Sequence, residues 1–542
     1  MGIKHFFFWY KNQFAKNITS INKGQKFRVP IDTLLLDMNG IFHNSTQKIY
    51  KYGSGAPPKR LLKNNVTQVL DTRENRELVY ADICETIGKL VEITRPRKRI
   101  FLGIDGCAPR GKMNQQRQRR FRTASESTSG CSFDSNSITP GTAFMHGLSG
   151  YIDKWLVDMK LNDTMWKEVE VVFSDEKVPG EGEHKAVEYI RDFCEPDEIF
   201  CINGLDADLI MLAMATHRPN FYIIRDDTFD PNNEYFCIDV SGARRELFRR
   251  LSWSSECVER DTINDFIFMC FLVGNDFLPH IPSVEIIEDG IEMMIDVYKG
   301  VGKVHGYLTE TRTDGQVVIR KRALRSFLET IGKLERTNFE KKIAKRSSFF
   351  PDPLMMRHAD NSKGGRWNIN VTSYKNEYHK ESFGKSEISE VCHQYIQGLQ
   401  WVITYYTTGC ASWDWMFPFQ YAPMASTMSE HVDSFSPLVY KPSKPAEPFE
   451  QLLSVLPPKS AHLLPKPLDT LLLDRSSELR KFCPDKIKID LAGKRREWEG
   501  ITLLPMVDKK VVTRSLNTKI GDVKEKDMIR NIKGYVIMYE AE

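Results

Sequence analysis

Short apolar runs alternate with amphipathic segments between Asp32 and Val240, and this alternation limits the possible folds more than any other feature. Apolar runs that are nearly continuous, with helices between them, are typical of parallel strands buried on both faces. The runs read as strands are TLLLDMNG (33–40), RIFLGIDG (99–106), VEVVFSDE (169–176), EIFCINGLD (198–206), FYIIRDD (221–227) and EYFCIDV (234–240). We therefore predict an α/β fold with a doubly wound, largely parallel sheet.

The rest of the chain divides by composition. We expect a first domain over residues 1–295, and an irregular basic connecting region over 296–387 in which only LRSFLETIGKL (324–334) favours a helix. The strong helical pattern that begins at Ile388 opens a second, mostly helical module over 388–510, packed against the first domain. Residues 511–542 read as a short C-terminal tail.

The cysteines indicate where the protein works. There are 11 of them, with no C-x-x-C pair and no secretory signal, which favours a reduced intracellular setting and gives no structural zinc site. The apolar opening HFFFWY is far too short for a membrane span, so no membrane association is expected. A net charge of +4 does not by itself indicate nucleic-acid binding, and nothing separates cytoplasm from nucleus.

Carboxylates recur where the predicted strands end. Ligand sites of parallel sheets lie at the carboxyl ends of strands, so acids that are distant in sequence are expected to meet in one cleft. The candidates are Asp37, Asp105, Glu181, Glu183, Asp206, Asp208 and Asp276. So many anions need cations, and all-oxygen ligands favour Mg²⁺, with Mn²⁺ as the alternative. Two such ions about 4 Å apart cleave phosphodiesters. Taken alone, Asp206 is explained about equally well as the N-cap of the following helix and as a metal ligand.

A basic stretch, APRGKMNQQRQRRFR (108–122), follows the strand that ends near Asp105. If this stretch is helical, one face carries Lys112, Gln116, Arg119 and Arg120. Such a face suits a terminal phosphate, which would place the scissile bond one nucleotide inward. Arg117 and Arg122 would point away, to solvent or to backbone. A solvated basic surface or a nuclear import signal is the plainer explanation.

Several of these segments together resemble the XRN family of 5′→3′ exoribonucleases over roughly residues 1–510. The matching blocks are LLLDMNGIFHN, IDGCAPRGKMNQQRQRRFRT, FDSNSITPGTAFM, VPGEGEHK, GLDADLIMLA, FLVGNDFLPH, WVITYYTTGCASWDW with QYAP, and EWEGITLLPMVD. The resemblance implies a sheet of the PIN-like 5′ nuclease type. It also implies a Mg²⁺-dependent enzyme that processively degrades single-stranded RNA with a 5′-monophosphate to mononucleotides, and rejects capped or triphosphorylated ends.

The resemblance also implies residue roles. The seven acids would bind two metal ions and carry out catalysis, and Lys112, Gln116, Arg119 and Arg120 would bind the 5′-phosphate. His43 would stack on the first base. A second stacking residue would be Trp413 or Trp415, and the pattern does not say which.

The sequence departs from the family in three places. The opening MGIKHFFFWY lacks the usual proline, the charged helix after the basic stretch is cut to ASESTSGC, and no extended region follows Val507. Partners that bind such a C-terminal region are therefore not expected, and other protein partners stay open.

The alternatives to an exoribonuclease are a structure-specific 5′ flap nuclease and a catalytically inactive RNA-binding scaffold. An aspartyl phosphatase would need D-x-D, and position 39 is Asn.

Overall fold

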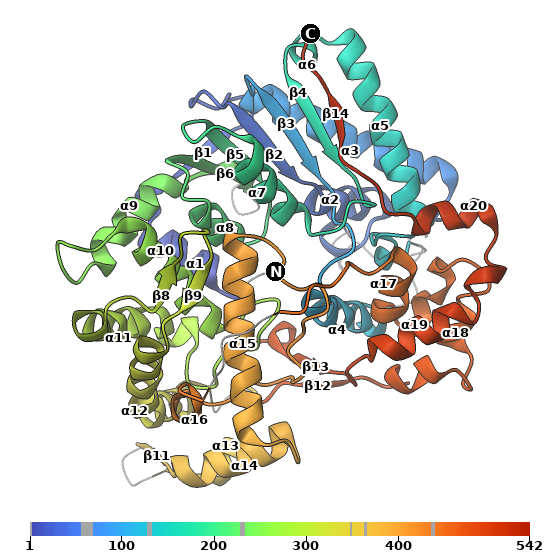
Figure 1. The fold of residues 1–542 in the computed structure, drawn as a ribbon. Coiled ribbons are helices and arrows are strands. Elements are labelled where there is room, and N and C mark those ends of the chain that lie inside the picture. The colour runs from blue at the N-terminus through green and yellow to red at the C-terminus, as the bar shows by residue number, and fades with distance from the viewer. Residues whose placement is uncertain are drawn as a thin grey trace, which may run out of the picture.

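An eight-stranded sheet forms the upper half of the molecule (Figure 1), in a computed structural model that describes residues 3–55, 69–126, 133–227, 233–346, 349–361, 366–434 and 440–542. Its order is β1 (Ile18–Asn22), β7 (Asn233–Asp239), β6 (Asn220–Asp226), β5 (Ile199–Asn203), β2 (Thr33–Asp37), β3 (Arg99–Gly103), β4 (Glu170–Ser174) and β14 (Ile537–Tyr539). The strands from β6 to β4 are parallel, and β1, β7 and β14 pair antiparallel. The predicted largely parallel α/β sheet is confirmed.

Helices cover both faces of the sheet, because successive strand residues are apolar and point to opposite sides. Leu35 belongs to one core with α1 (Phe6–Gln13), α7 (Gly182–Phe193), α8 (Leu209–Ala215), α9 (Val240–Leu251) and α10 (Glu259–Cys270). Leu34 and Leu36 belong to a second core with α2 (Met38–Tyr50), α3 (Arg73–Thr94) and α5 (Ala143–Asn162). The short α6 (Thr164–Lys167) precedes β4. The sheet is thus doubly wound.

The expectation of a C-terminal tail over 511–542 is wrong. This segment forms α19 (Lys509–Asn517), α20 (Glu525–Met528) and then β14, which pairs with β4 at the edge of the main sheet. The Gly534 amide donates to the Lys177 carbonyl at 3.1 Å, and the Tyr539 hydroxyl donates to Asp153. The end of the described chain is therefore an integral part of the first domain (Figure 1).

The irregular connection expected over 296–387 is also wrong. Apart from residues that the structure does not describe, this region is built of regular elements. They are α11 (Gly290–His305), β8 (Thr309–Thr311), β9 (Val317–Ile319), α12 (Lys321–Arg346), α13 (Pro353–Arg357), β10 (Ala359–Asn361), β11 (Trp367–Ile369) and α14 (Val371–Phe383). Leu324, Phe327 and Ile331 lie at helical spacing in α12 and are fully buried, although charged residues surround them in the sequence.

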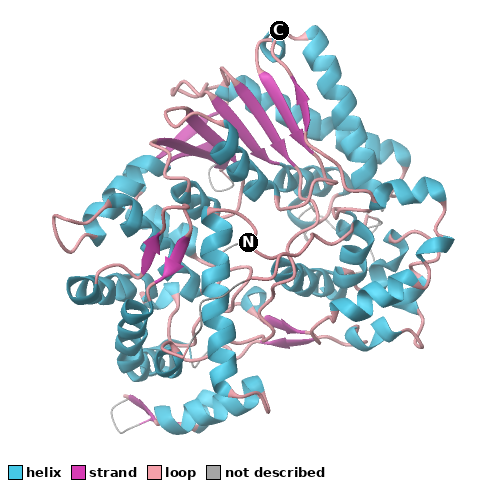
Figure 2. Cartoon of the chain, viewed as in Figure 1, coloured by secondary structure: helices cyan, strands magenta, loops and turns pink. Residues whose placement is uncertain are grey.

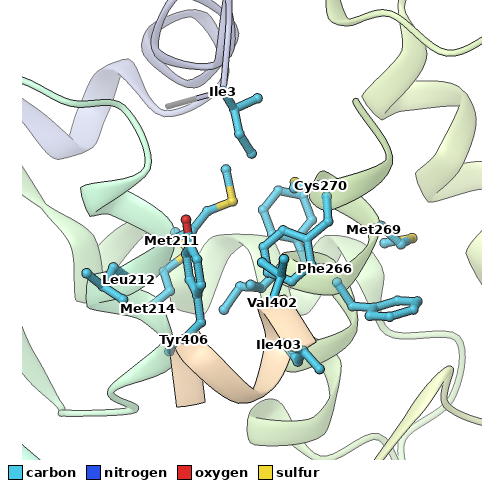
Figure 3. Packing of buried hydrophobic residues seen from close by; sticks show 14 of the residues in the cluster. Ile3, Met211, Leu212, Met214, Phe266, Met269, Cys270, Val402, Ile403 and Tyr406 are labelled. Atoms are coloured by element: carbon cyan, nitrogen blue, oxygen red, sulfur yellow. The ribbon is translucent and has the colours of Figure 1, made fainter. Parts of the chain in front are cut away.

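The long helix α15 (Ile388–Thr407) connects the two halves of the molecule, and helices predominate in the lower half (Figure 2). Val402, Ile403 and Tyr406 of α15 share one core with Phe266 of α10 and Met211 of α8 (Figure 3). The module continues through α16 (Ala425–His431), α17 (Pro448–Val455), α18 (Thr470–Leu473), β12 (Lys488–Asp490) and β13 (Ile501–Leu503).

The basic stretch forms α4 (Arg110–Glu126), so its predicted helix is confirmed. Phe121 of α4 lies in a third core that is otherwise drawn from residues 449–523. This helix therefore stands between the sheet and the C-terminal elements. Among the described residues, no helix combines the length and the apolar character that a membrane crossing requires.

Candidate active site

Seven acids from five separate segments meet beyond the carboxyl ends of the parallel strands. Burial raises the pKa of Asp37 well above its usual range, and the charges of Asp105 and Asp206 add to this effect. Burial raises the pKa of Asp208 to about 7, with added repulsion from Asp206 and Asp276. The remaining acids, Glu181 and Glu183, flank the first residue of α7. Burial raises the pKa of Glu183 as well, and Asp208 and Asp37 raise it further. The structure thus brings the predicted acids together.

Asp105 is held in place by two hydrogen bonds. The Asn39 amide donates from Nδ2 to Oδ2 at 2.8 Å, and the Gly182 backbone N–H donates to Oδ1 at 2.7 Å. Residue 182 has to be glycine, because a Cβ there would lie only 2.6 Å from the Gly103 carbonyl oxygen. The close approach of α7 to the end of β3 therefore fixes the position of Asp105.

Lys112 lies inside the acid cluster. Its ammonium contacts Glu181 and donates to Asp276 Oδ2 at 2.6 Å. Burial alone would lower the pKa of Lys112, but the charges of Asp276 and Glu181 raise it well above its usual range. Glu181 also accepts from the Tyr405 hydroxyl at 3.2 Å. As placed here, the lysine neutralises two carboxylates.

Within the ranges that the structure describes, no three ligating side chains stand close enough to hold a metal ion as they are placed. The Lys112 ammonium separates two of the acids. The donor set nevertheless suits a hard cation, because all its members offer oxygen. Asp208 Oδ1 is buried and accepts no hydrogen bond. The raised pKa values of Asp37, Glu183 and Asp208 come first from burial and then from mutual repulsion, and a divalent ion would offset both effects.

The other predicted cations lie on α4 near His43. Arg120 is buried and donates to Gln116 Oε1 at 3.2 Å and to Thr139 Oγ1 at 2.9 Å, while Arg119 is exposed. Burial, together with the charges of Arg119 and Arg120, lowers the pKa of the half-buried His43 to about 3. His43, Gln116, Arg119 and Arg120 therefore form one cluster of donors beside the acids.

Arg117 and Arg122 of α4 contact backbone, as predicted. Arg117 is buried and donates to the carbonyls of Pro505, at 2.9 Å, and Phe482. Arg122 donates to the Glu497 carbonyl at 2.8 Å.

The structure separates the two candidate tryptophans. Trp415 is buried in the core and stacks on Trp401 with ring centroids 5.0 Å apart, so no face of it is open to a base. Trp413 is half-buried, and its ring lies 4.0 Å from the position that a Cβ of Gly180 would occupy, directly before Glu181. Trp415 is therefore set aside, and Trp413 stays the candidate for base stacking.

Sequence reasoning gave no role to three residues that shape the site. Lys185 is buried and its ammonium donates to the carbonyls of Ser174, Asp175 and Val178 at 3.0–3.3 Å, which fixes the loop before Glu181. Asn39 orients Asp105, and Tyr405 contacts Glu181 from α15. All three lie inside motifs quoted from the sequence, but only the fold shows that Tyr405 of α15 reaches Glu181.

Carboxylates at the carboxyl edge of a parallel α/β sheet, beside a cationic helix, define a phosphodiester-cleaving nuclease. The chain matches the XRN 5′-3′ exonuclease N-terminus over residues 1–227 and the Xrn1 helical domain over 258–364 and 358–541. This chain belongs to the XRN 5′-3′ exonuclease family.

Three relatives illustrate the match. The chain is 31% identical to the 5′-3′ exoribonuclease 2 homolog of Drosophila melanogaster, over 99% of this chain and 73% of that protein. It is 31% identical to 5′-3′ exoribonuclease 2 of Gallus gallus, over 99% of this chain and 72% of that protein. It is 27% identical to 5′-3′ exoribonuclease 1 of Saccharomyces cerevisiae, over 99% of this chain and 44% of that protein.

Proposed function

We propose that this chain is a processive 5′→3′ exoribonuclease that acts on single-stranded RNA with a 5′-monophosphate and uses two Mg²⁺ ions, or Mn²⁺, to release mononucleotides. The observation that carries the proposal is the meeting of seven acids beside the cationic cluster of α4. The XRN relatives, which are named exoribonucleases, support RNA as the substrate.

Asp37, Asp105, Glu181, Glu183, Asp206, Asp208 and Asp276 would hold the ions. When bound, Mg²⁺ would activate water and stabilise the leaving oxygen. The protein's own part is to keep these oxygens in place: Asn39 and the Gly182 amide orient Asp105, and Tyr405 orients Glu181. The Lys112 ammonium offsets the charge of Glu181 and Asp276.

The donors of α4 would bind the end of the RNA. Burial and the charge of Arg119 lower the pKa of Arg120, so a terminal phosphate within reach of both guanidiniums relieves their repulsion. His43 would stack on the first base as a neutral ring, because its pKa lies far below neutrality. Trp413 would supply the second stacking surface. Lys112 would assist in phosphate binding once metal ions compensate its two acids.

The test compares RNAs of one sequence that carry a 5′-monophosphate, triphosphate or hydroxyl end, with Mg²⁺ or EDTA. We expect that only the RNA with a 5′-monophosphate is degraded, that this requires Mg²⁺ and stops in EDTA, and that the products are mononucleotides. Arg119→Ala should reduce the preference for the monophosphate end by about 1.5–3 kcal/mol, the value of a charge-assisted hydrogen bond. Equal degradation of all three ends would contradict end recognition.

Asp208→Asn is the matched control for catalysis. It should abolish cleavage and retain RNA binding, and in EDTA its unfolding midpoint should not fall, because the substitution removes a charge from a repulsive cluster. Cleavage of a branched DNA flap in preference to RNA would favour the flap nuclease instead. Tight RNA binding without cleavage under any metal would favour the inactive scaffold.

A further inference from the structure

His184 is a buried histidine in the first turn of α7, directly after Glu183. Glu181 is the N-cap of this helix and Gly182 is its first residue, so two of the acids and the histidine belong to one short stretch. Only 8% of His184 is exposed. A histidine at such a place can carry a proton, bind a metal ion or act through its ring alone. The contacts of the ring distinguish these roles.

Two tyrosines of α15 contact the imidazole of His184. The imidazole stacks on Tyr405 with ring centroids 3.7 Å apart and planes 18° from parallel, and Tyr406 meets it edge-on at 5.3 Å. The next closest ring pair among the described residues, Tyr50 and Phe133, has its centroids 4.4 Å apart. Tyr406 itself lies in the core that α15 shares with α8 and α10 (Figure 3). These contacts favour a role for the ring over a role for its nitrogens.

The stack continues from Tyr405 into the second module. Tyr405 stacks on Trp401, one helical turn earlier in α15, with centroids 5.0 Å apart, and Trp401 stacks on Trp415 at the same separation. All three rings are buried. Aromatic pairs of this kind stabilise a fold beyond the area that they bury. His184 is therefore the last ring of a continuous series whose other members belong to the second module.

This end of the series lies against an acid of the candidate site. The Tyr405 hydroxyl donates to Glu181 Oε1 at 3.2 Å, in a contact that is buried from solvent. The hydroxyl keeps this place only while the Tyr405 ring does, and the rings of His184 and Trp401 both stack on that ring. Glu181 lies three residues before His184, so α7 and α15 are joined here by one stack and one hydrogen bond. Groups that orient a metal ligand in this way set the affinity for the metal.

We propose that His184 is a positioning residue: its ring, stacked on Tyr405, keeps the Tyr405 hydroxyl on Glu181 and so sets the affinity of the acid cluster for a divalent ion. This inference rests on the proposed function, in which Glu181 and Glu183 bind the ions. The ring of His184 is what matters for this role, and its nitrogens are not needed. The second module thus takes part in metal binding, although none of the seven candidate acids comes from it.

The experiment measures the affinity of the metal-free protein for Mn²⁺ by isothermal titration calorimetry, without RNA. His184→Phe keeps a ring and removes both nitrogens, and it should bind Mn²⁺ as tightly as the wild type. His184→Leu removes the ring, and it should weaken binding about 10- to 100-fold, the effect of losing a group that orients a metal ligand. Equal losses in the two variants would show that a nitrogen is needed, and an unchanged affinity of His184→Leu would show that the stack is not. Either result would overturn the proposal.

Tyr405→Phe is a second variant, which leaves the stack in place and removes only the hydroxyl. It should weaken Mn²⁺ binding as much as His184→Leu does. The double variant should lose no more than either single variant, because both changes act through the same hydrogen bond to Glu181. An unchanged affinity of Tyr405→Phe, or losses that add in the double variant, would mean that this hydrogen bond does not carry the effect of His184, which contradicts the proposal.

Phe221→Leu is the matched control. Phe221 is buried in β6 and stacks on Phe200 of β5 with centroids 5.8 Å apart, near the amino ends of both strands and so away from the acids. This variant should lower the unfolding midpoint and leave the Mn²⁺ affinity unchanged. A loss of affinity equal to that of His184→Leu would reveal a general effect of destabilisation and overturn the assignment.

The measurement also separates this inference from the proposed function. Absence of Mn²⁺ binding by the wild type would contradict both of them. Tight binding by the wild type that none of the His184 and Tyr405 variants weakens would contradict the role of His184 alone.

Discussion

At the scale of single residues, the site depends on neutral side chains as much as on acids. Asn39 takes the place that a second aspartate would occupy in a D-x-D motif, and its amide both donates to Asp105 Oδ2 and accepts from the Asp105 backbone. A carboxylate there would add to the repulsion among Asp37, Asp105 and Asp206. The amide orients an acid without adding charge.

We predict that Asn39→Ala lowers kcat about 10- to 100-fold, as expected for a residue that orients a metal ligand. The affinity for RNA in EDTA should stay unchanged, because the side chain of Asn39 hydrogen-bonds to Asp105 and the cations of α4 are left in place. Asn44→Ala, an exposed position on the same helix whose amide donates to Asp226 at 3.0 Å, is the control. Equal activity of the two variants would show that Asp105 needs no such partner.

At the scale of elements, pairing between distant segments stabilises the region beyond the first domain. Asp265 of α10 is fully buried and accepts hydrogen bonds from Tyr298 of α11, from the backbone of Leu308 and from both the backbone and the hydroxyl of Thr309, at 2.6–2.9 Å. One carboxylate thus joins α10, α11 and the start of the β8–β9 hairpin.

We predict that Asp265→Asn destabilises the protein by about 2–4 kcal/mol, because an amide NH₂ faces donors and leaves buried groups without acceptors. Denaturant unfolding followed by circular dichroism measures this loss. Asp296→Asn on the exposed face of α11 should change stability by less than about 0.5 kcal/mol. A loss below about 1 kcal/mol at Asp265 would mean that the hairpin is held by its apolar contacts alone.

Sequence patterns predict the buried parallel strands and miss the edge strands. The parallel strands were found because both faces are apolar, as in Thr33–Asp37, which is buried throughout. Ile18–Asn22 and Ile537–Tyr539 were missed because edge strands bury few side chains and carry no apolar run. The acids were predicted from their place after strands. The position of Lys112, by contrast, depends on how α4 is rotated, which spacing alone does not give.

At the scale of the whole molecule, segments far apart in sequence complete the first domain. β1 closes one edge of the sheet and β14 closes the other. β14 pairs with β4, and the Gly534 amide bonds to Lys177 in the loop that leads to Glu181. The second module reaches the acids as well, through Tyr405. The first domain is therefore not an independent unit.

We predict that ending the chain after Ile532 lowers the unfolding midpoint by several degrees and increases aggregation, because β4 becomes an unpaired edge. Differential scanning fluorimetry and light scattering measure both effects. Removing only Ala541 and Glu542, which deletes the single bond from Glu542 N–H to the Lys167 carbonyl at 2.9 Å, is the control. Identical behaviour of the two truncations would show that β14 adds nothing to stability.

The pairing of β4 with β14 also sets an order of events during translation. Phe173 emerges from the ribosome several hundred residues before its partner Ile537. Throughout that interval the growing polypeptide carries an open strand edge next to the loop that leads to Glu181. This edge of the sheet is therefore completed only after translation, when β14 reaches β4.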